Sequence, residues 1–474
     1  MLQAHAISRV DSFSSTMSGQ AWYAWEWLYD GFIAAIHNAM GLNGVVAFSA
    51  LVIAGTFTLV LRLALRRGAS LPMATALLLL SVGACSIHLL ARPHLLSWLF
   101  AVLWFQIVDS AAKNPEKRRR LYWLPVLMLV WVNVHGGFVF GLVLLVLYIV
   151  GGWIQYFSSG NVEDRQRIGE LHKQLGVVTA LSLLATLVNP YGYKLHQHIY
   201  GYLADRFLMN HIDEFLSPNF HHVPQQCFEI VLLIAILALA ISYRKLAASQ
   251  LLVVLFAASS GLYASRNLPI SSLLLVLVIA PLLSETFAAV AERQGIAPWL
   301  RMVFASLHSF GARMERMELS FRGHLWPAVG VLACFLICLH GGMLGSTQVM
   351  DARFDPSRFP VQAAEILSDR GSNVPVFCPD TWGGYLIYQL YPKTKVVVDD
   401  RHDMYGSEFF KNYLKVVQVQ PGWDKVLDDQ HVTRILIPAN SSLSVLLKQT
   451  SQWVAVHEDD TAIYFKRNDN NLER

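Results

Sequence analysis

The chain of 474 residues is 54% hydrophobic and only 15% charged, and its mean hydropathy is +0.41. A soluble domain carries about 25% charged residues, so this composition excludes a soluble protein and indicates a polytopic membrane protein. The net charge of +4 is unevenly placed: residues 1–347 carry 23 Lys and Arg against 16 Asp and Glu, and residues 348–474 carry 14 against 17. A basic excess confined to membrane loops excludes a nucleic-acid-binding surface. The five cysteines show no metal-ligand or disulfide spacing.

The N-terminal region reads as a loop outside the membrane. Residues 1–20 are polar and lack the apolar core of a signal peptide. Residues 21–40 carry three tryptophans and two tyrosines beside Glu26 and Asp30, a mixture typical of a helix at the membrane interface. We therefore expect residues 1–42 to form an extracytoplasmic loop with an interfacial helix.

A transmembrane domain is predicted over residues 43–347, because ten apolar segments follow one another there. They lie at 43–64, 72–90, 95–112, 122–134, 138–157, 175–188, 227–243, 247–264, 268–287 and 325–346. The long connection at 289–323 predicts a cytoplasmic amphipathic segment with aromatic residues among arginines.

The stretch WVNVHGG at 131–137 interrupts an otherwise apolar run over 121–157. Polar groups and glycines favour a turn at a membrane face, since an irregular backbone in hydrocarbon would lack partners. With a turn there, one side of the membrane collects 18 Lys and Arg and the other only five. A single kinked span would leave 11 against 12. The positive-inside rule therefore favours two spans, with the N-terminus and the C-terminal domain outside the cytoplasm.

Residues 348–474 change in composition and predict a small α/β domain with a mixed sheet. The expected helices lie at 354–369, 382–390, 408–417, 423–428 and 443–450. The expected strands lie at 374–378, 395–399, 434–437, 454–458 and 462–466.

This topology brings unusual polar residues to the outer ends of the spans, where charges are expensive unless they face a cavity or a partner. Asp11 and Glu26 are candidates for an acid–base role or for holding a divalent ion. Arg92 and Arg266 suit bidentate bonds to a lipid phosphate. The remaining candidates for substrate binding on this face are His94, Asn133, His135, Asn189, Tyr191 and Asn267.

Each of these residues also has a plain structural interpretation. The two arginines could snorkel to head groups, and the histidines could be satisfied structural residues. Asp11 could be solvated, and Glu26 could only fix an interfacial helix. The glycines of WGGY at 382–385 could allow close packing at a helix start. The joint occurrence of these candidate residues on one predicted face is a stronger indication of a functional site than any single residue.

Several stretches together resemble the large bacterial membrane proteins of the glycosyltransferase-C type with a C-terminal extracytoplasmic domain. They are RVDSFS at 9–14, WEWL at 25–28, RPH at 92–94, WVNVHGG at 131–137, NPYG at 189–192, RNLP at 266–269, WGGYL at 382–386 and DDRHDMYG at 399–406.

The resemblance implies a polyprenyl-phosphate-linked sugar donor and an acidic residue on the first outside loop, a role that Asp11 or Glu26 would fill. It adds Trp382, Tyr385 and Arg401 as binding candidates, in a region similar to the acceptor-side domain of oligosaccharyltransferases. Their Trp-Trp-Asp-Tyr-Gly signature is absent, so recognition of a peptide acceptor does not carry over. Relatives usually begin with a membrane helix, an acidic residue and a Trp-Trp-His stretch. Because this sequence starts beyond them, we expect either an upstream start or the loss of one catalytic carboxylate.

Two functions remain open at this point. The first is a glycosyltransferase of the bacterial plasma membrane that moves a sugar from the polyprenyl-phosphate-linked donor to an extracytoplasmic acceptor. The second is a non-catalytic membrane protein that binds lipid-linked glycans or assembles partners. A transporter fits less well, because the sequence shows no inverted repeat. The cofactor is unknown, with a divalent cation as one option and no metal-ligand residues assigned; the sugar, the acceptor and the oligomeric state are not indicated.

The predicted topology can be tested at the C-terminus. A reporter enzyme that is active only in the cytoplasm, fused after Arg474, should be inactive, because the charge distribution places this end outside. The same reporter fused within the basic connection at 113–120 should be active and serves as the control. Strong activity of the C-terminal fusion would overturn the topology.

Overall fold

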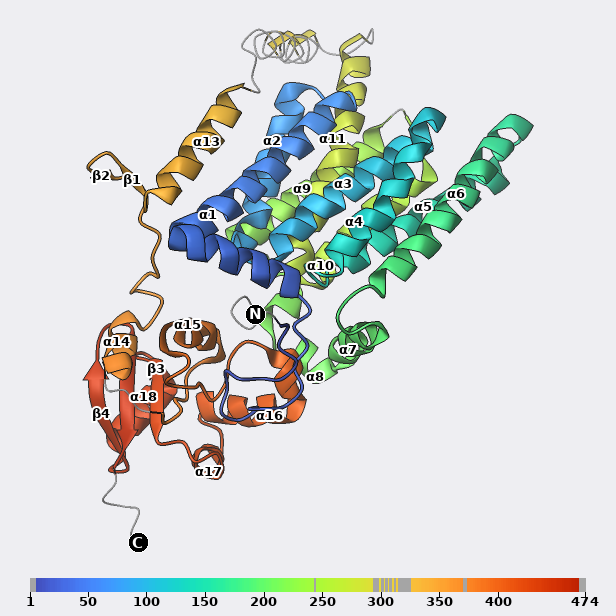
Figure 1. The fold of residues 1–474 in the computed structure, drawn as a ribbon. Coiled ribbons are helices and arrows are strands. Elements are labelled where there is room, and N and C mark those ends of the chain that lie inside the picture. The colour runs from blue at the N-terminus through green and yellow to red at the C-terminus, as the bar shows by residue number, and fades with distance from the viewer. Residues whose placement is uncertain are drawn as a thin grey trace. The chain divides into compact units, whose positions relative to one another are not determined.

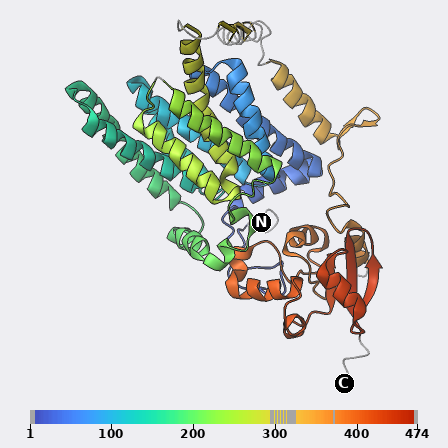
Figure 2. The ribbon, with the colours of Figure 1, turned by 180° about the vertical axis from the view of Figure 1, so that it is seen from behind.

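The chain forms two compact units in the computed structural model, which describes residues 6–242, 244–292, 325–369 and 373–468 with isolated residues between 298 and 313 (Figures 1 and 2). The membrane unit comprises Trp25–Gln197 and Asn210–Asp351, and the α/β unit comprises Met1–Ala24, His198–Met209 and Ala352–Arg474. The sequence analysis instead placed the boundaries at 42 and 347. The predicted amphipathic segment at 289–323 lies largely outside the described residues.

The described secondary structure of the membrane unit is helical, apart from the short strands β1 and β2. Its long helices are α1 (Trp27–Arg66), α2 (Leu71–Cys85), α3 (His94–Lys113), α5 (Phe138–Ser158), α6 (Val162–Thr186), α9 (Val223–Ile241), α10 (Ala248–Tyr263), α11 (Leu268–Glu292) and α13 (Leu325–Leu339). Its short elements are η1 (Ser86–His88), η2 (Pro115–Trp123), α4 (Leu124–Trp131), η3 (Asp213–Phe215), η4 (Ser265–Asn267), β1 (Met343–Leu344) and β2 (Thr347–Gln348). Helix α7 (Tyr193–Ala204) begins in this unit, and α8 (Arg206–Met209) belongs to the α/β unit.

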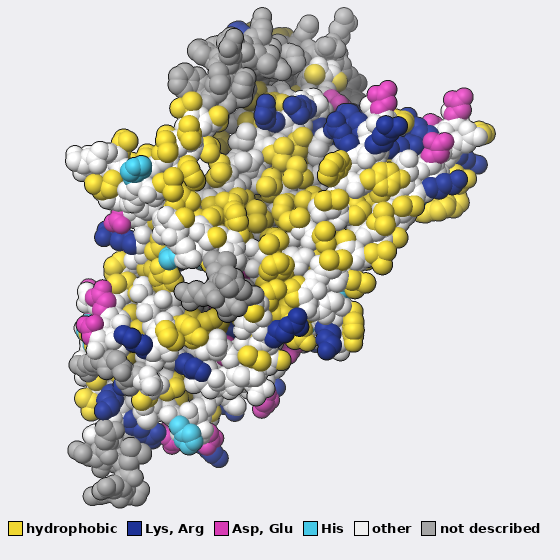
Figure 3. Space-filling view, viewed as in Figure 1, with side chains coloured by type: hydrophobic (Ala, Val, Ile, Leu, Met, Phe, Trp, Pro, Cys, Tyr) yellow, Lys and Arg dark blue, Asp and Glu magenta, His cyan; other side chains and the backbone are white. Residues whose placement is uncertain are grey.

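Each of the ten predicted spans coincides with helical structure, and the chain is a multi-pass membrane protein. Six described helices are long and apolar enough to cross a membrane, and two shorter apolar helices accompany them. Figure 3 shows hydrophobic side chains over the flank of these helices. Helix α4 has eight residues and rises only ~12 Å, so the count of ten spans stays a prediction. The expected break over 131–137 is present, because α4 ends at Trp131 and α5 begins at Phe138.

The predicted interfacial helix and the first span form one element, α1, with a kink at Gly41. Gly41 has a φ of 59°, in the left-handed region that favours glycine. The helix begins at Trp27 rather than at residue 21, because residues 21–24 belong to the α/β unit, where the Trp22 N–H donates to the Arg9 carbonyl.

Helix α11 is the centre of the membrane unit and packs against α1, α2, α3, α9 and α10. Its residues 268–283 are buried almost without interruption, which explains their apolar sequence on all sides of the helix. A polar contact within this packing joins Ser272 to Ser81 of α2, with 2.8 Å between the hydroxyl oxygens.

The α/β unit is built around an antiparallel sheet in the order β3–β5–β4, with β3 at Arg434–Pro438, β4 at Trp453–Glu458 and β5 at Ala462–Arg467. Parallel bridges continue this sheet from Ile435 to Phe377, from Val376 to Val396 and from Val396 to Ser14. The mixed sheet is therefore as predicted, although the expected strands at 374–378 and 395–399 are reduced to single bridge pairs. The N-terminal segment supplies its outermost position.

Each of the five helices predicted for the C-terminal part of this unit has an observed counterpart, although the first begins seven residues after the predicted start at 354. The observed helices are α14 (Val361–Asp369), α15 (Asp380–Leu390), α16 (His402–Val417), α17 (Trp423–Asp429) and α18 (Ser442–Gln449). Helix α16 begins six residues before the predicted helix at 408–417 and bends at Gly406.

Helix α15 approaches the backbone at Asp399 so closely that one of its two adjacent glycines has no room for a side chain. A Cβ at Gly383 would lie 2.5 Å from the Cα of Asp399, whereas a Cβ at Gly384 would meet nothing within 4 Å. The glycine pair is thus a matched test of the close-packing interpretation.

We expect Gly383→Ala to lower the free energy of unfolding by about 1–3 kcal/mol, because helix α15 must move away from the backbone at Asp399. Gly384→Ala should raise it by about 0.5–1 kcal/mol, since alanine replaces glycine in an exposed helical position. Thermal unfolding of the purified full-length variants measures both effects. Equal shifts in the two variants would contradict the close approach.

Candidate functional site

Most of the candidate residues gather at one end of the membrane unit, where helices begin or end. Glu26 precedes α1, Arg92 and His94 stand at the start of α3, and His135 lies between α4 and α5. Glu214 and Arg266 lie in the short helices η3 and η4. We call these six residues the helix-end cluster.

A chain of hydrogen bonds fixes His135. The indole N–H of Trp131 donates to the Ser97 hydroxyl (2.8 Å), whose oxygen lies 2.8 Å from Nδ1 of His135. The Gly137 N–H also donates to this Nδ1 (3.0 Å). Nδ1 is therefore an acceptor, and we assign the imidazole proton to Nε2.

Glu26 is the acidic partner of this histidine. Its Oε1 lies 3.8 Å from Nε2 of His135, and its side chain is 27% exposed. Burial lowers the pKa of His135 well below its ordinary value, and the nearby charge of Arg266 adds to this effect. The imidazole is thus neutral at pH 7 and presents an N–H toward a partly exposed carboxylate.

His94 and His88 extend the cluster. Nε2 of His94 lies 2.8 Å from the His88 carbonyl, and the ring centres of His94 and His135 are 6.5 Å apart. Among the described residues, Nε2 of His88 is buried and has no hydrogen-bond partner. The cluster therefore presents a buried nitrogen that is available to a further donor or acceptor.

Arg92 and Arg266 share the acidic residue Glu214. The guanidinium of Arg266 lies over the ring of Phe215, 4.4 Å from its centre. Burial raises the pKa of the Glu214 carboxyl, but the charges of Arg266 and Arg92 outweigh it and hold the pKa below its ordinary value. The two arginines that the sequence analysis paired are therefore brought into one electrostatic group.

Three asparagines among the candidates are occupied by the backbone. The Asn133 amide donates to the carbonyls of Leu129 (2.8 Å) and Val188 (2.9 Å) and accepts from the indole of Trp27 (2.8 Å). The Asn189 amide donates to Thr186 and Gly192 and accepts from the N–H of Tyr191, and the Asn267 amide donates to Ser260. These bonds give each of the three asparagines a structural role that does not require a ligand.

Asp11 lies in the α/β unit rather than with Glu26. Its carboxylate is fully buried and pairs with Arg401 (2.8 Å), which is also bound by both carboxylate oxygens of Asp399. The Asp11 carboxylate also accepts from the Ser14 hydroxyl (2.6 Å) and from the N–H groups of Phe13 and Ser14. These contacts give both Asp11 and Arg401 a structural role.

The titration of Asp11 follows from this setting. Burial raises the pKa of its carboxyl, but the hydrogen bond from Ser14 and the charge of Arg401 together lower the pKa by more. The pKa of Asp11 therefore lies below its ordinary value. Ionised Asp11 therefore stabilises the folded state above about pH 4. This contribution is lost as the pH falls through the folded-state pKa.

Trp382 and Tyr385 also lie in the α/β unit, in its hydrophobic core. The Trp382 indole donates to the Arg358 carbonyl (3.0 Å), and the Tyr385 ring lies 4.7 Å from that of Phe354. Their burial fits the close-packing interpretation of this stretch.

Ser97 and His88 were not among the residues predicted from the sequence, and the structure brings both to the helix-end cluster. Ser97 follows His94 by three residues, a spacing that places both on one face of a helix, so this signal was available. The sequence already places Glu214 on the outer face beside Asp213, but its pairing with Arg92 and Arg266 could be found only from the fold, because these partners are far away in sequence. The part of the chain that the structure describes contains no group of three or more His, Cys, Asp or Glu residues that could hold a metal ion.

The sequence matches no protein-family model and none of the curated proteins. Among solved structures, the fold is similar to that of ArnT from Cupriavidus metallidurans bound to undecaprenyl phosphate. The similarity covers 94% of this chain and 88% of that one, with a TM-score of 0.47 and 14% sequence identity.

Proposed function

We propose that this protein is a membrane glycosyltransferase that moves a sugar from a polyprenyl-phosphate-linked donor to an acceptor outside the cytoplasm. The observation that carries the proposal is the pairing of Glu26 with His135 in the helix-end cluster, which also holds Arg92 and Arg266. The family resemblance of the motifs that contain these residues supports it.

The chemistry needs a base and a stabilised leaving group, and this cluster offers both. An acceptor hydroxyl attacks the anomeric carbon and passes its proton to the Glu26 carboxylate. The bond between the anomeric carbon and the phosphate oxygen breaks, and the phosphate leaves with the electron pair. Arg92 and Arg266 would stabilise that negative charge. His135 would position Glu26 through its Nε2–H, since Nδ1 is already occupied.

The proposed donor also suits the setting. A polyprenyl chain stays in the bilayer beside the apolar helices, and its phosphate lies at the level of the helix ends. We therefore place the protein in the bacterial plasma membrane, with the lipid bilayer and the lipid-linked sugar as partners.

A binding protein without transferase activity is the second candidate, and the position of Asp11 favours it. Of the two proposed catalytic carboxylates, Asp11 is buried against Arg401, so Glu26 alone stands in the helix-end cluster. Transfer assays on the wild-type protein and on variants that lack either carboxylate test which of the two functions the protein has.

We expect Glu26→Gln to reduce transfer from a polyprenyl-phosphate-linked sugar by about 100-fold or more, because the base is lost. Its unfolding temperature should change little, because glutamine keeps the size of the side chain and its amide oxygen can still face the Nε2–H of His135. Asp11→Asn should lower the free energy of unfolding by about 1–3 kcal/mol through lost hydrogen bonds, while the folded fraction keeps its activity. Transfer assays and thermal unfolding measure both properties. Wild-type protein that binds the lipid but transfers no sugar would leave the binding function. A fully active Glu26→Gln variant would instead contradict the role of Glu26 as the base.

Arg92→Lys and Arg266→Lys should each weaken the binding of a polyprenyl phosphate by about 1–3 kcal/mol, because lysine keeps the charge but loses the planar fork. Arg244→Lys is the matched control, since Arg244 forms an exposed ion pair with Glu285. Equilibrium binding to the purified variants measures the effect. Equal affinities in all variants would show that the two arginines only reach the interface.

A further inference from the structure

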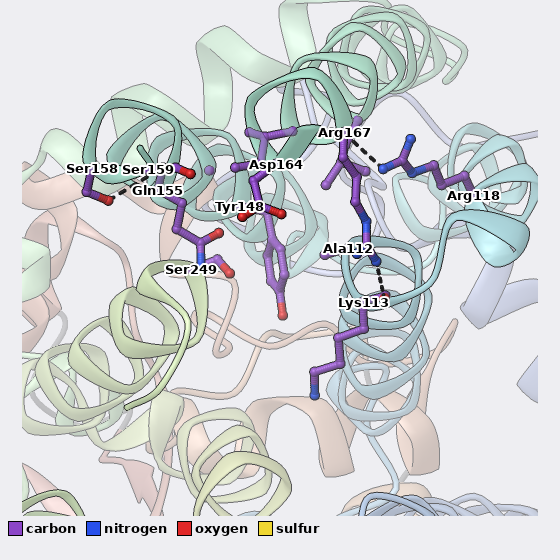
Figure 4. A pocket seen from close by; sticks show the side chains of 13 residues that line it. Ala112, Lys113, Arg118, Tyr148, Gln155, Ser158, Ser159, Asp164, Arg167 and Ser249 are labelled. Carbon is purple, nitrogen blue, oxygen red and sulfur yellow. Dashed lines mark hydrogen bonds between the residues drawn. The ribbon is translucent and has the colours of Figure 1, made fainter. Parts of the chain in front are cut away.

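A polar cavity lies at the ends of the membrane helices opposite to the helix-end cluster. It has a volume of ≈410 Å³ and is lined by η2 and residues of α3, α5, α6 and α10 (Figure 4). Helix α3 begins in the helix-end cluster at His94 and ends at Lys113 in this cavity. Twenty helical residues span ~30 Å, so the cavity is separate from the proposed catalytic site.

Cations dominate the lining of this cavity. Lys113, Arg118 and Arg167 face it with Asp164 as the carboxylate among the lining residues. The short helix η2, which carries Arg118, adds three exposed cations: Lys117, Arg119 and Arg120. Figure 3 shows Lys and Arg side chains gathered at this end of the helices. The cavity therefore attracts anions.

Arg118 has a buried hydrogen-bond donor without an acceptor in the described part of the chain. Its side chain is 7% exposed, and it pairs with Glu170 (3.2 Å) and donates to the Arg167 carbonyl (2.9 Å). Among the described residues, its buried Nε has no hydrogen-bond partner. A buried guanidinium N–H without an acceptor is costly, and an anion in the cavity would supply one.

The neighbouring cations are held in place. The Arg167 guanidinium donates to the Lys113 carbonyl (2.7 Å), as Figure 4 shows, while the Lys113 ammonium lies 3.0 Å from Asp109. Asp109 is shared with Arg67 (3.0 Å), so it neutralises only part of this charge. With Arg67 included, four cations thus lie in or beside this cavity against three carboxylates, those of Asp109, Asp164 and Glu170.

We infer that this cavity binds a phosphate group that carries a small polar substituent. Guanidinium groups match phosphate oxygens, and the volume lies in the range of small-ligand pockets, about 300–1,000 Å³. Two sources share this chemistry: the head group of an anionic phospholipid, as basic pockets between membrane helices bind, and a soluble phosphate ester.

The experiment compares two arginines of helix α6. Arg167→Gln removes a cation from the cavity, whereas Arg165→Gln removes one that stacks on Tyr156 instead. Both residues are exposed, so both variants should fold. The probes are dihexanoyl phosphatidylglycerol, glycerol 3-phosphate and, as the neutral control, dihexanoyl phosphatidylcholine, titrated into the purified full-length protein below micelle-forming concentrations.

We expect one of the two anionic probes to bind saturably and Arg167→Gln to weaken that binding about tenfold or more, the scale of a charged hydrogen bond. Arg165→Gln should change it less than about threefold. Binding of the phosphatidylglycerol alone identifies a lipid head group, and binding of glycerol 3-phosphate identifies a soluble ester. Absence of saturable binding by either probe, or equal losses in both variants, would overturn the inference.

Discussion

The cost of a charge inside a helical membrane unit organises this structure, and Asp109 shows how the cost is met. The residue is 2% exposed, and its carboxylate pairs with Arg67 and Lys113, each at 3.0 Å. It also accepts from the hydroxyl of Tyr148 (2.7 Å) and from the amide of Gln250 (2.9 Å). These partners come from the C-cap of α1, from α3 itself, from α5 and from α10, so one carboxylate joins four helices. Removing the Asp109 carboxylate would leave the buried Arg67 charge without a carboxylate partner, which is strongly destabilising.

The same constraint separates the two ends of the unit. Near its start, α3 presents His94 and Ser97 to a cluster in which Glu214 compensates Arg92 and Arg266. The final turn of α3 presents its charged groups to the basic cavity. Between these ends, the described core contacts are mainly apolar, as the burial of α11 illustrates. The charged groups of each end thus lie outside the apolar packing that connects them.

The helical segments of the membrane unit could be predicted from the sequence, because long apolar runs are visible locally. The orientation that the positive-inside rule gives them stays a prediction. The helices of the α/β unit were equally visible, since their periodicity is local. The pairing of Asp11 with Arg401 was not, because 390 positions separate the two residues and each is ordinary in its own segment. The site was predicted in part for the same reason. Motif residues such as His135 could be found locally, whereas the partnership of Glu214 with the arginines exists only after folding.

The contact between the N-terminal segment and the C-terminal part of the α/β unit has a consequence for the order in which the unit assembles. The hydroxyl of Thr16 donates to the carbonyl of Val397, 381 positions later. Synthesis at about 5–20 residues per second separates these two partners by roughly 20–75 s. During that interval the membrane helices are made while the outer edge of the sheet has no strand to pair with. The contact order of this small unit is thus set by the whole membrane region between its two parts, so the unit can be completed only after that region has been synthesised.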